Sequence, residues 1–192
     1  MSELLEIRWH GRGGQGAKTA AVLLAEVVSA AGRYIQGFPE YGPERMGAPV
    51  LAFNRISDRP IDLHCHVTEP DVVVVLDPTL LGKAGVSEGL AADGSVLVNT
   101  PRPPGEIRRE LGLSFGRVFT VDASQIAVDT LGKNIPNTPM IGALVRVTGV
   151  MGLDEFLPLM KVQLQEKFKA KGDVVEGNLK AIERAYREVR GE

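Results

Sequence analysis

A glycine-rich turn between a predicted strand and a predicted helix is the feature that most limits how this chain can fold. The apolar run 4–9 predicts the strand, and residues 17–26 predict the start of the helix. The turn consists of Gly11, Arg12, Gly13, Gly14, Gln15 and Gly16. Glycines let the backbone approach a ligand closely, and the free N–H groups of a first helical turn attract anions. The turn therefore predicts an α/β fold and a phosphate or carboxylate ligand.

The length, composition and net charge of the sequence exclude several classes of protein. A chain of 192 residues, 44% hydrophobic and 24% charged, is long enough for one well-buried domain, which we expect to span residues 1–192. The net charge of -2 leaves no basic excess, so no nucleic-acid partner is expected. We find no apolar run long enough for a membrane span and no signal-peptide layout at residues 1–3, which predicts a cytoplasmic protein without a membrane partner.

Short apolar runs predict the strands of the central sheet. Four successive valines in 71–77 have no polar face, which is typical of a strand buried on both sides in a parallel sheet. Runs 95–99 and 117–121 predict further strands. Residues 34–38 read as extended, and 50–56 predict a strand for which 61–67 would be the hairpin partner.

Helices are predicted over 15–31, 122–131 and 138–150, and again over 153–171 and 174–190 in a helical C-terminal region. Residues 101–105 hold three prolines and a glycine and predict a loop. The alternation of strands and helices predicts a single three-layer α/β/α domain with a mostly parallel, Rossmann-like sheet.

A second loop, residues 38–49, concentrates charge, aromatic side chains and fixed backbone angles. Its candidate site residues are Glu40, Tyr41, Gly42, Pro43, Glu44, Arg45 and Gly47. Arg45, like Arg12 in the first turn, could form a bidentate pair with a phosphate or carboxylate, and Tyr41 could stack on a base or acyl group. The alternative is an internal Arg–Glu pair with Tyr41 covering a sheet edge.

The glycine turn also matches the G-x-G-x-x-G pattern of dinucleotide-binding folds. The acid that such a site needs about 20 residues later has only Glu40 as a candidate, and Glu40 sits in the proline-glycine loop instead of at the end of a second strand. A tight turn that binds no ligand is the other alternative.

Other polar positions carry weaker signals. His64 and His66 would share one face of a strand, but two ligands do not make a metal site, so no metal is expected and both histidines are expected to be solvated. Cys65 is expected to be a small buried side chain. Asp77 and Asn99 follow predicted strands, where they could hold a ligand or cap the next turn.

The two loops together carry a resemblance to a known family. Residues 7–18, followed by 38–49 and the valine strand, resemble the gamma subunit of pyruvate:ferredoxin oxidoreductase and related 2-oxoacid oxidoreductases, over essentially the whole chain. The resemblance implies a subunit of an enzyme that oxidatively decarboxylates a 2-oxoacid, most simply pyruvate, with coenzyme A, giving acyl-CoA, carbon dioxide and reduced ferredoxin.

The resemblance also implies a division of labour between subunits. Thiamine diphosphate with Mg²⁺ would lie between the alpha and beta subunits, and [4Fe-4S] clusters in the beta and ferredoxin-like delta subunits would pass electrons to ferredoxin. This chain would bind none of these alone, since its single cysteine cannot hold a cluster. It would have no catalytic residue of its own.

The family's glycine loop falls on Gly11 to Gly16, and its second motif falls on the candidate residues of 40–47. The resulting hypothesis places the helix-start amides and Arg12 toward coenzyme A phosphates or acidic groups of a partner, and the second loop at the subunit interface. Alternatives that stay open are a stand-alone NAD- or FAD-dependent oxidoreductase, an assembly subunit that touches no ligand, and a subunit for 2-oxoisovalerate or an aryl glyoxylate.

Overall fold

A computed structural model describes residues 4–40, 46–82, 85–169 and 172–192. The strands are β1 (Leu4–Arg12), β2 (Tyr34–Pro39), β3 (Pro49–Ser57), β4 (Val72–Val75), β5 (Ser95–Asn99), β6 (Arg117–Val121) and β7 (Arg190–Gly191). The helices are α1 (Ala17–Ala30), η1 (Pro78–Leu80), α2 (Pro104–Leu111), α3 (Ala123–Leu131), α4 (Asn137–Thr148), α5 (Leu153–Phe168) and α6 (Gly172–Glu188).

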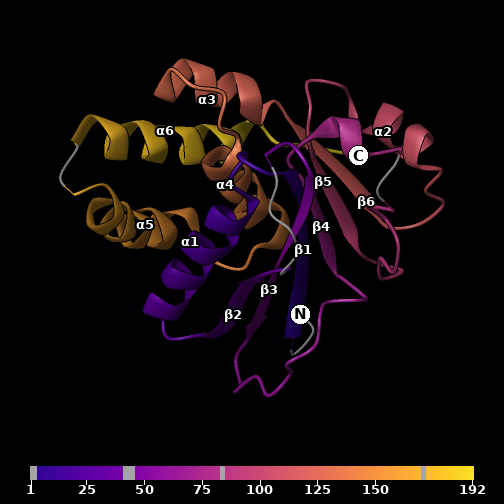
Figure 1. Cartoon of the computed structure of the whole chain (residues 1–192), viewed down its shortest axis with the longest axis horizontal. Helices are drawn as coiled ribbons and strands as arrows, with labels where there is room; N and C mark the ends of the chain where they lie inside the picture. Colours follow the sequence, from indigo (N-terminus) through magenta and orange to yellow (C-terminus); the bar gives the residue numbers. More distant parts are fainter. Residues whose placement is uncertain (1–3, 41–45, 83–84, 170–171) are drawn as a thin grey trace.

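One sheet runs through the molecule in the order β2-β3-β1-β4-β5-β6-β7. Strands β1, β4, β5 and β6 are parallel, whereas β3 is antiparallel to β1 and β2 is antiparallel to β3. Helices α1, α3, α4, α5 and α6 lie on one side of the sheet and α2 lies on the other (Figure 1). The predicted three-layer α/β/α architecture with a mostly parallel sheet is confirmed.

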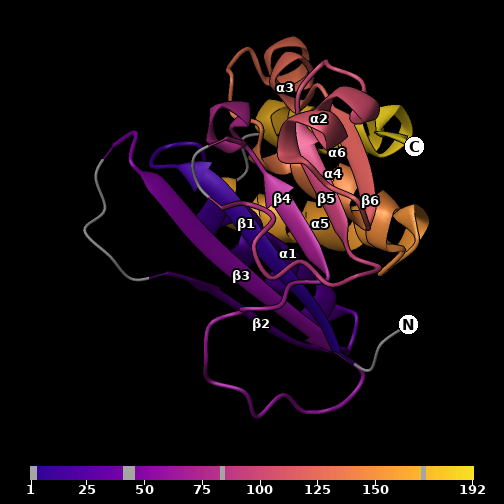
Figure 2. The same ribbon diagram turned by 90° about the vertical axis from the view of Figure 1, so that its right-hand side faces the viewer.

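Side chains alternate between the two faces of each strand, so the sheet packs against a helical layer on both sides. In β4, Val72 and Val74 join the core under the large helical layer, while Val73 and Val75 join the core under α2, as the valine run predicts. In β1, Ile7 and Trp9 face the large helical layer and are fully buried. The polar residues that alternate with them, Glu6, Arg8 and His10, face the opposite side of the sheet. On that side no helix covers β1, β2 or β3 (Figure 2).

The two helices α4 and α6 cross in close contact, and one glycine makes this possible. A β-carbon added to Gly142 would lie 2.2 Å from the carbonyl oxygen of Ile182. Residues around the crossing, including Leu144 and Ala181, are fully buried. The absence of a side chain at Gly142 therefore sets the distance between these helices.

Two sequence-based predictions of secondary structure are wrong. Residues 61–67 form no strand, because both edges of β3 are already paired, one with β1 and the other with β2. The predicted loop 101–105 ends in the first turn of α2, since Pro104 occupies the first helical position, where proline lacks no hydrogen bond.

Strand β7 covers part of the far edge of the sheet. Its two residues pair antiparallel with Phe119 and Thr120 of β6. The Glu192 carboxylate next to it receives hydrogen bonds from the Arg108 guanidinium of α2. The end of the described chain is thereby attached to the sheet and to α2 together.

Candidate functional site

The glycine turn lies at the carboxyl end of β1 and leads straight into α1. Gly16 is the residue before the helix and adopts the left-handed conformation, with φ 83° and ψ 26°. Gly14 also has positive φ, at 97°. The Gln15 side chain closes the turn by accepting a hydrogen bond from the Arg12 N–H, at 2.8 Å. The predicted order of strand, turn and helix is confirmed, and positive φ is the reason that glycine occurs at both positions.

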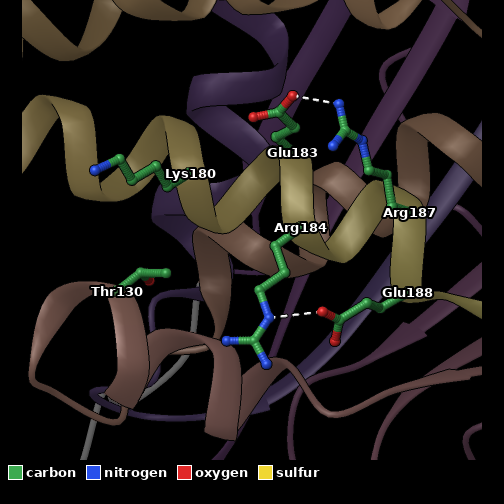
Figure 3. Close-up of a pocket in the computed structure, with 6 residues that line it drawn as sticks. All are labelled: Thr130, Lys180, Glu183, Arg184, Arg187 and Glu188. Carbon is green, nitrogen blue, oxygen red and sulfur yellow. Dashed lines mark hydrogen bonds and ion pairs between the residues drawn. The ribbon is translucent and has the colours of Figure 1, made fainter.

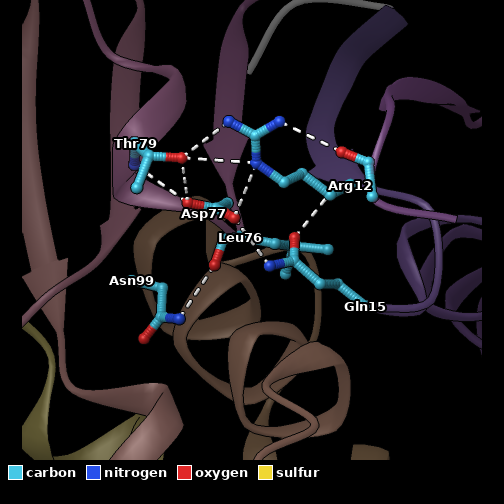
Figure 4. Close-up of polar contacts among 7 residues, drawn as sticks. Arg12, Gln15, Leu76, Asp77, Thr79 and Asn99 are labelled. Carbon is cyan, nitrogen blue, oxygen red and sulfur yellow. Dashed lines mark hydrogen bonds and ion pairs between the residues drawn. The ribbon is translucent and has the colours of Figure 1, made fainter.

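Arg12 reaches from this turn to the end of β4 (Figure 4). Its Nε donates to Asp77 Oδ2 at 3.1 Å, its Nη2 donates to Thr79 Oγ1 at 2.8 Å, and its Nη1 donates to the Gly47 carbonyl at 3.1 Å. The Arg12 side chain remains 31% exposed. A guanidinium has five N–H groups, so the contacts with described residues leave two of them for another acceptor.

Asp77 is the acceptor at the centre of the network. It receives hydrogen bonds from the Thr79 N–H and hydroxyl on one oxygen, and from Gln15 and Arg12 on the other. Burial acts to raise the pKa of the Asp77 carboxyl, but these hydrogen bonds and the Arg12 charge outweigh burial and lower it. Asp77 also caps η1, so the capping alternative predicted for it is confirmed.

The second loop meets the glycine turn through its backbone. The Gly13 N–H donates to the Ala48 carbonyl at 2.9 Å, and the Gly47 N–H donates to the Gly13 carbonyl at 3.1 Å. Glu40, which directly follows β2, does not join this contact. Its carboxylate lies 4.0 Å from Nδ1 of His66. Tyr41, Gly42, Pro43, Glu44 and Arg45 lie outside the described residues. Of the second motif, the structure thus brings Gly47 to the glycine turn.

Asn137, at the start of α4, lies against the same turn and was not predicted as a site residue. A β-carbon on Gly16 would lie 2.7 Å from Asn137 Nδ2. The starts of α1 and α4 therefore meet at Gly16. The sequence did predict a helix start near Thr138. No sequence pattern, however, indicated that residue 137 would lie against residue 16.

Two buried basic residues of β1 also escaped sequence-based prediction. Arg8 donates to His10 Nε2 at 3.0 Å and to the carbonyl of Val86 at 3.1 Å. Burial, with the Arg8 charge as a second cause, lowers the pKa of His10 to about 4. His10 is therefore neutral near pH 7 and serves Arg8 as an acceptor.

The other residues singled out from the sequence show no arrangement for chemistry in the structure. Asn99 bridges strand and helix, since its amide donates to the Leu76 carbonyl and its Oδ1 accepts from the Ser124 N–H of α3. Cys65 is exposed, which corrects the expectation that it is buried. His64 and His66 are solvated as expected but lie in an irregular segment and not on a strand. Among the described residues, no group of three or more metal-ligating side chains could hold a metal ion.

A depression over α3 and α6 is lined by Thr130 and by charged residues of α6, which Figure 3 shows. Arg184 bonds to Glu188 at 2.7 Å and to Asp129 at 2.6 Å, and Arg187 bonds to Glu183 at 2.6 Å. These exposed ion pairs belong to the helix surface. No helix in the described part of the chain is long and apolar enough to cross a membrane.

The sheet topology bears on the dinucleotide alternative. A dinucleotide-binding fold takes its ribose-binding acid from the end of a second, parallel strand beside β1. Here β1 has an antiparallel neighbour, β3, and a parallel neighbour, β4, and Glu40 follows neither of them, since it comes after β2, one strand beyond β3. The acid is therefore not placed where such a cofactor needs it.

Comparison with known proteins places the chain in one family. The model of the family described as pyruvate ferredoxin/flavodoxin oxidoreductase matches residues 6–188. The pyruvate synthase subunit PorC of Thermotoga maritima is 49% identical over 96% of this chain and 94% of its own length. The pyruvate/ketoisovalerate oxidoreductases common subunit gamma of Pyrococcus abyssi is 44% identical over 95% of this chain and 96% of its own length.

A solved structure agrees with these relatives. The crystal structure of pyruvate oxidoreductase subunit PORC from Thermotoga maritima superposes with a TM-score of 0.86 at 46% identity, covering 100% of this chain and 99% of that one. The chain therefore belongs to the pyruvate ferredoxin/flavodoxin oxidoreductase family and corresponds to its gamma subunits.

Proposed function

We propose that this chain works in a multisubunit enzyme that oxidatively decarboxylates pyruvate. The reaction joins the acyl group of the 2-oxoacid to coenzyme A, releases carbon dioxide and passes two electrons to ferredoxin. The observation that carries the proposal is the match along nearly the whole chain to the pyruvate synthase subunit PorC. In this assignment the chain supports the reaction of the complex and is not catalytic alone.

The chemistry of this chain suits a subunit that leaves the cofactors to its partners. Thiamine diphosphate supplies the carbanion-stabilising chemistry of such enzymes when it is bound, and iron–sulfur clusters carry the electrons. The residues of this chain do not fit a cluster, because its one cysteine is exposed and a four-cysteine site is needed. Alpha, beta and delta subunits in the cytoplasm would hold these groups, with ferredoxin as the acceptor.

The glycine turn would form part of the coenzyme A side of the cleft. The helix-start amides of α1 and the two uncommitted N–H groups of Arg12 are donors suited to a phosphate. The hydrogen bonds between Gly13 and residues 47–48 tie the second loop to this turn. A ligand at the turn and a partner at the second loop would then be neighbours.

The choice of 2-oxoacid would belong to other subunits. A relative 44% identical to this chain is named as a subunit common to pyruvate and ketoisovalerate oxidoreductases, which supports a gamma subunit that does not set the substrate. Pyruvate is our first candidate because relatives from several organisms are named pyruvate synthase subunits. 2-Oxoisovalerate is the second.

A tagged pull-down from the native organism tests the proposal. The proteins that co-purify are identified by mass spectrometry and assayed for viologen reduction that depends on a 2-oxoacid and coenzyme A. Recovery of thiamine diphosphate-binding and cluster-binding partners with pyruvate-dependent activity supports it. A chain recovered alone, or a complex without this activity, overturns it.

A further inference from the structure

Helix α4 packs against α6 and also against α1 (Figure 1). In the described part of the chain, the buried side chains of α4 and α6 are apolar apart from three: Asn137 and Thr138 in the first turn of α4, and Asn178 in α6. Each of these three is at most 7% exposed. Burial of polar groups is unfavourable unless they are hydrogen-bonded, so their position inside an apolar contact needs a physical reason.

Hydrogen bonds connect the three polar side chains in a fixed order. Asn178 Nδ2 donates to the Val174 carbonyl one turn earlier in α6 at 2.7 Å. Asn178 Oδ1 then accepts from the Thr138 hydroxyl at 2.8 Å. The Thr138 N–H donates in turn to Asn137 Oδ1, also at 2.8 Å. The first turn of α4 is thereby attached to α6, and the Asn137 side chain is held in one orientation.

Asn137 carries this connection to the glycine turn. Its side chain fills the space that a side chain at Gly16 would need, since a β-carbon there would lie 2.7 Å from Asn137 Nδ2 and 3.1 Å from its Cβ. The Gly16 carbonyl accepts from the Ala20 N–H at 2.8 Å in the first turn of α1. Gln15, the residue before Gly16, donates to Asp77 at 2.8 Å. A displacement of Asn137 would therefore reach the start of α1 and the network around Asp77.

A polar pair inside an apolar contact fixes how two helices align. If α4 slid along α6, the Thr138 hydroxyl and Asn178 Oδ1 would be buried without each other, which is unfavourable. An apolar pair at these positions would not resist such a slide in this way. The pair lies in the turn of α4 that contacts Gly16, so the alignment that it fixes is the one that places Asn137 on the glycine turn.

We propose that Thr138 and Asn178 are positioning residues for the glycine turn. Through Asn137 they hold Gly16 and the start of α1 in the geometry that the assembled enzyme needs to use coenzyme A. The part that concerns coenzyme A rests on the proposed function. Both residues act from behind the turn, since their described hydrogen bonds stay within α4 and α6.

Hydrogen exchange of the full-length chain tests the connection between α6 and the glycine turn. Thr138→Val keeps the shape of the side chain but removes the donor to Asn178, and is expected to speed exchange of the Ala20 N–H about tenfold. Thr138→Ser keeps the hydroxyl and should exchange at close to the wild-type rate. Thr148→Val removes a hydroxyl hydrogen bond to the Leu144 carbonyl at the other end of α4 and is the matched control.

Exchange at Val74, a buried residue of β4, reports opening of the whole domain and serves as the reference. Asn178→Leu breaks the same hydrogen bond from the α6 side, so the result does not depend on the folding of one variant. Ala20 exchange that stays constant relative to Val74 in both variants, or that rises equally in Thr148→Val, would overturn the connection. This measurement uses the chain alone, so its failure is distinct from a pull-down that finds no partners.

Kinetics of the assembled enzyme test whether this geometry matters for the reaction. Complexes that carry Thr138→Val are expected to assemble and to show a KM for coenzyme A raised about tenfold with kcat unchanged. Thr138→Ser should restore the KM, and Thr148→Val should keep the wild-type value. A purely structural role would lower the yield of complex and leave the KM of the remaining complex unchanged, and that result would overturn the positioning role.

Discussion

Arg12 Nε and Asp77 Oδ2 lie 3.1 Å apart and connect the carboxyl ends of two adjacent parallel strands, β1 and β4. Because Arg12 also donates to the Gly47 carbonyl, one guanidinium links the glycine turn, the segment after β4 and the second loop. Asp77 in turn accepts from Gln15 at 2.8 Å. The Arg12–Asp77 ion pair therefore lies at the centre of a hydrogen-bond network that joins the three segments of the candidate site.

Asp77→Asn is expected to destabilise the chain near pH 7 by about 1.5–3 kcal/mol, the range for hydrogen bonds to a charged group. The lowered pKa of Asp77 means that the folded state holds its proton less tightly than the unfolded chain. The carboxylate stabilises the fold above its ordinary pKa of 3.8, and this stability is lost as pH falls through the lowered value.

Urea unfolding at pH 7 and at stepwise lower pH measures this effect. The difference between wild type and Asp77→Asn should shrink as the pH falls below about 4. Asp62→Asn, which makes the same change at an exposed position, is the control. A difference that is the same at every pH would show that Asp77 stabilises the site without its charge.

His10→Gln is expected to remove part of the pH dependence of stability. Since the folded-state pKa of His10 is about 4 and its ordinary value is 6.5, the unfolded chain binds the proton more tightly between these values. Stability therefore rises with pH across this window, by up to about 1.4 kcal/mol per pH unit. Glutamine still offers an oxygen to Arg8 but does not titrate.

Unfolding free energies measured between pH 4 and 7 check this prediction, with His64→Gln at an exposed position as the control. The wild type and His64→Gln should share the slope, and His10→Gln should have a shallower one. Identical slopes for all three chains would mean that His10 keeps its proton affinity on folding.

Gly142→Ala is expected to be among the most damaging single-methyl changes in the chain. The added carbon would lie 2.2 Å from the Ile182 carbonyl oxygen, so α4 and α6 would have to separate within a fully buried contact. Overpacking of this kind costs about 1–3 kcal/mol. Gly105→Ala, in α2, meets no atom within 4 Å and should leave the melting temperature nearly unchanged or raise it slightly. Thermal unfolding of both variants decides whether the crossing is rigid.

Arg12→Ala and Arg45→Ala are expected to affect coenzyme A use by the assembled enzyme. If the glycine turn and second loop form the coenzyme A side of the cleft, each change should raise the KM for coenzyme A, by about tenfold for the loss of one charged hydrogen bond. Arg102→Ala removes two exposed ion pairs, with Glu106 and Glu110 of α2, and controls for the loss of surface charge. Complexes that assemble normally and keep the wild-type KM would contradict this role.

Local sequence patterns were sufficient for the parts of the fold that depend on neighbouring residues. The valine run of β4 indicated burial on both faces, and the glycine turn indicated the step from β1 to α1. Residues 61–67 were misassigned because strand pairing depends on which edges are free, and β2 occupies the remaining edge of β3. α2 was missed because prolines at a helix start resemble those of a loop.

The sequence predicted the backbone turn of the candidate site, but not the contacts that its side chains make with distant residues. The glycine turn could be identified because its residues are consecutive. Arg12 and Asp77 are 65 positions apart, and residues 16 and 137 are farther still. Such contacts are set by the tertiary fold, so no spacing rule in the sequence reveals them.

The two edges of the sheet have a consequence for how this chain can assemble. β2 ends in Pro39, which has no N–H to offer a further strand, and on the opposite side the short β7 lies over β6. Neither edge presents a long ladder of free backbone groups in the described part of the chain. Subunits that join this protein are therefore expected to dock on its loops and sheet faces, and not to extend its sheet by β-augmentation.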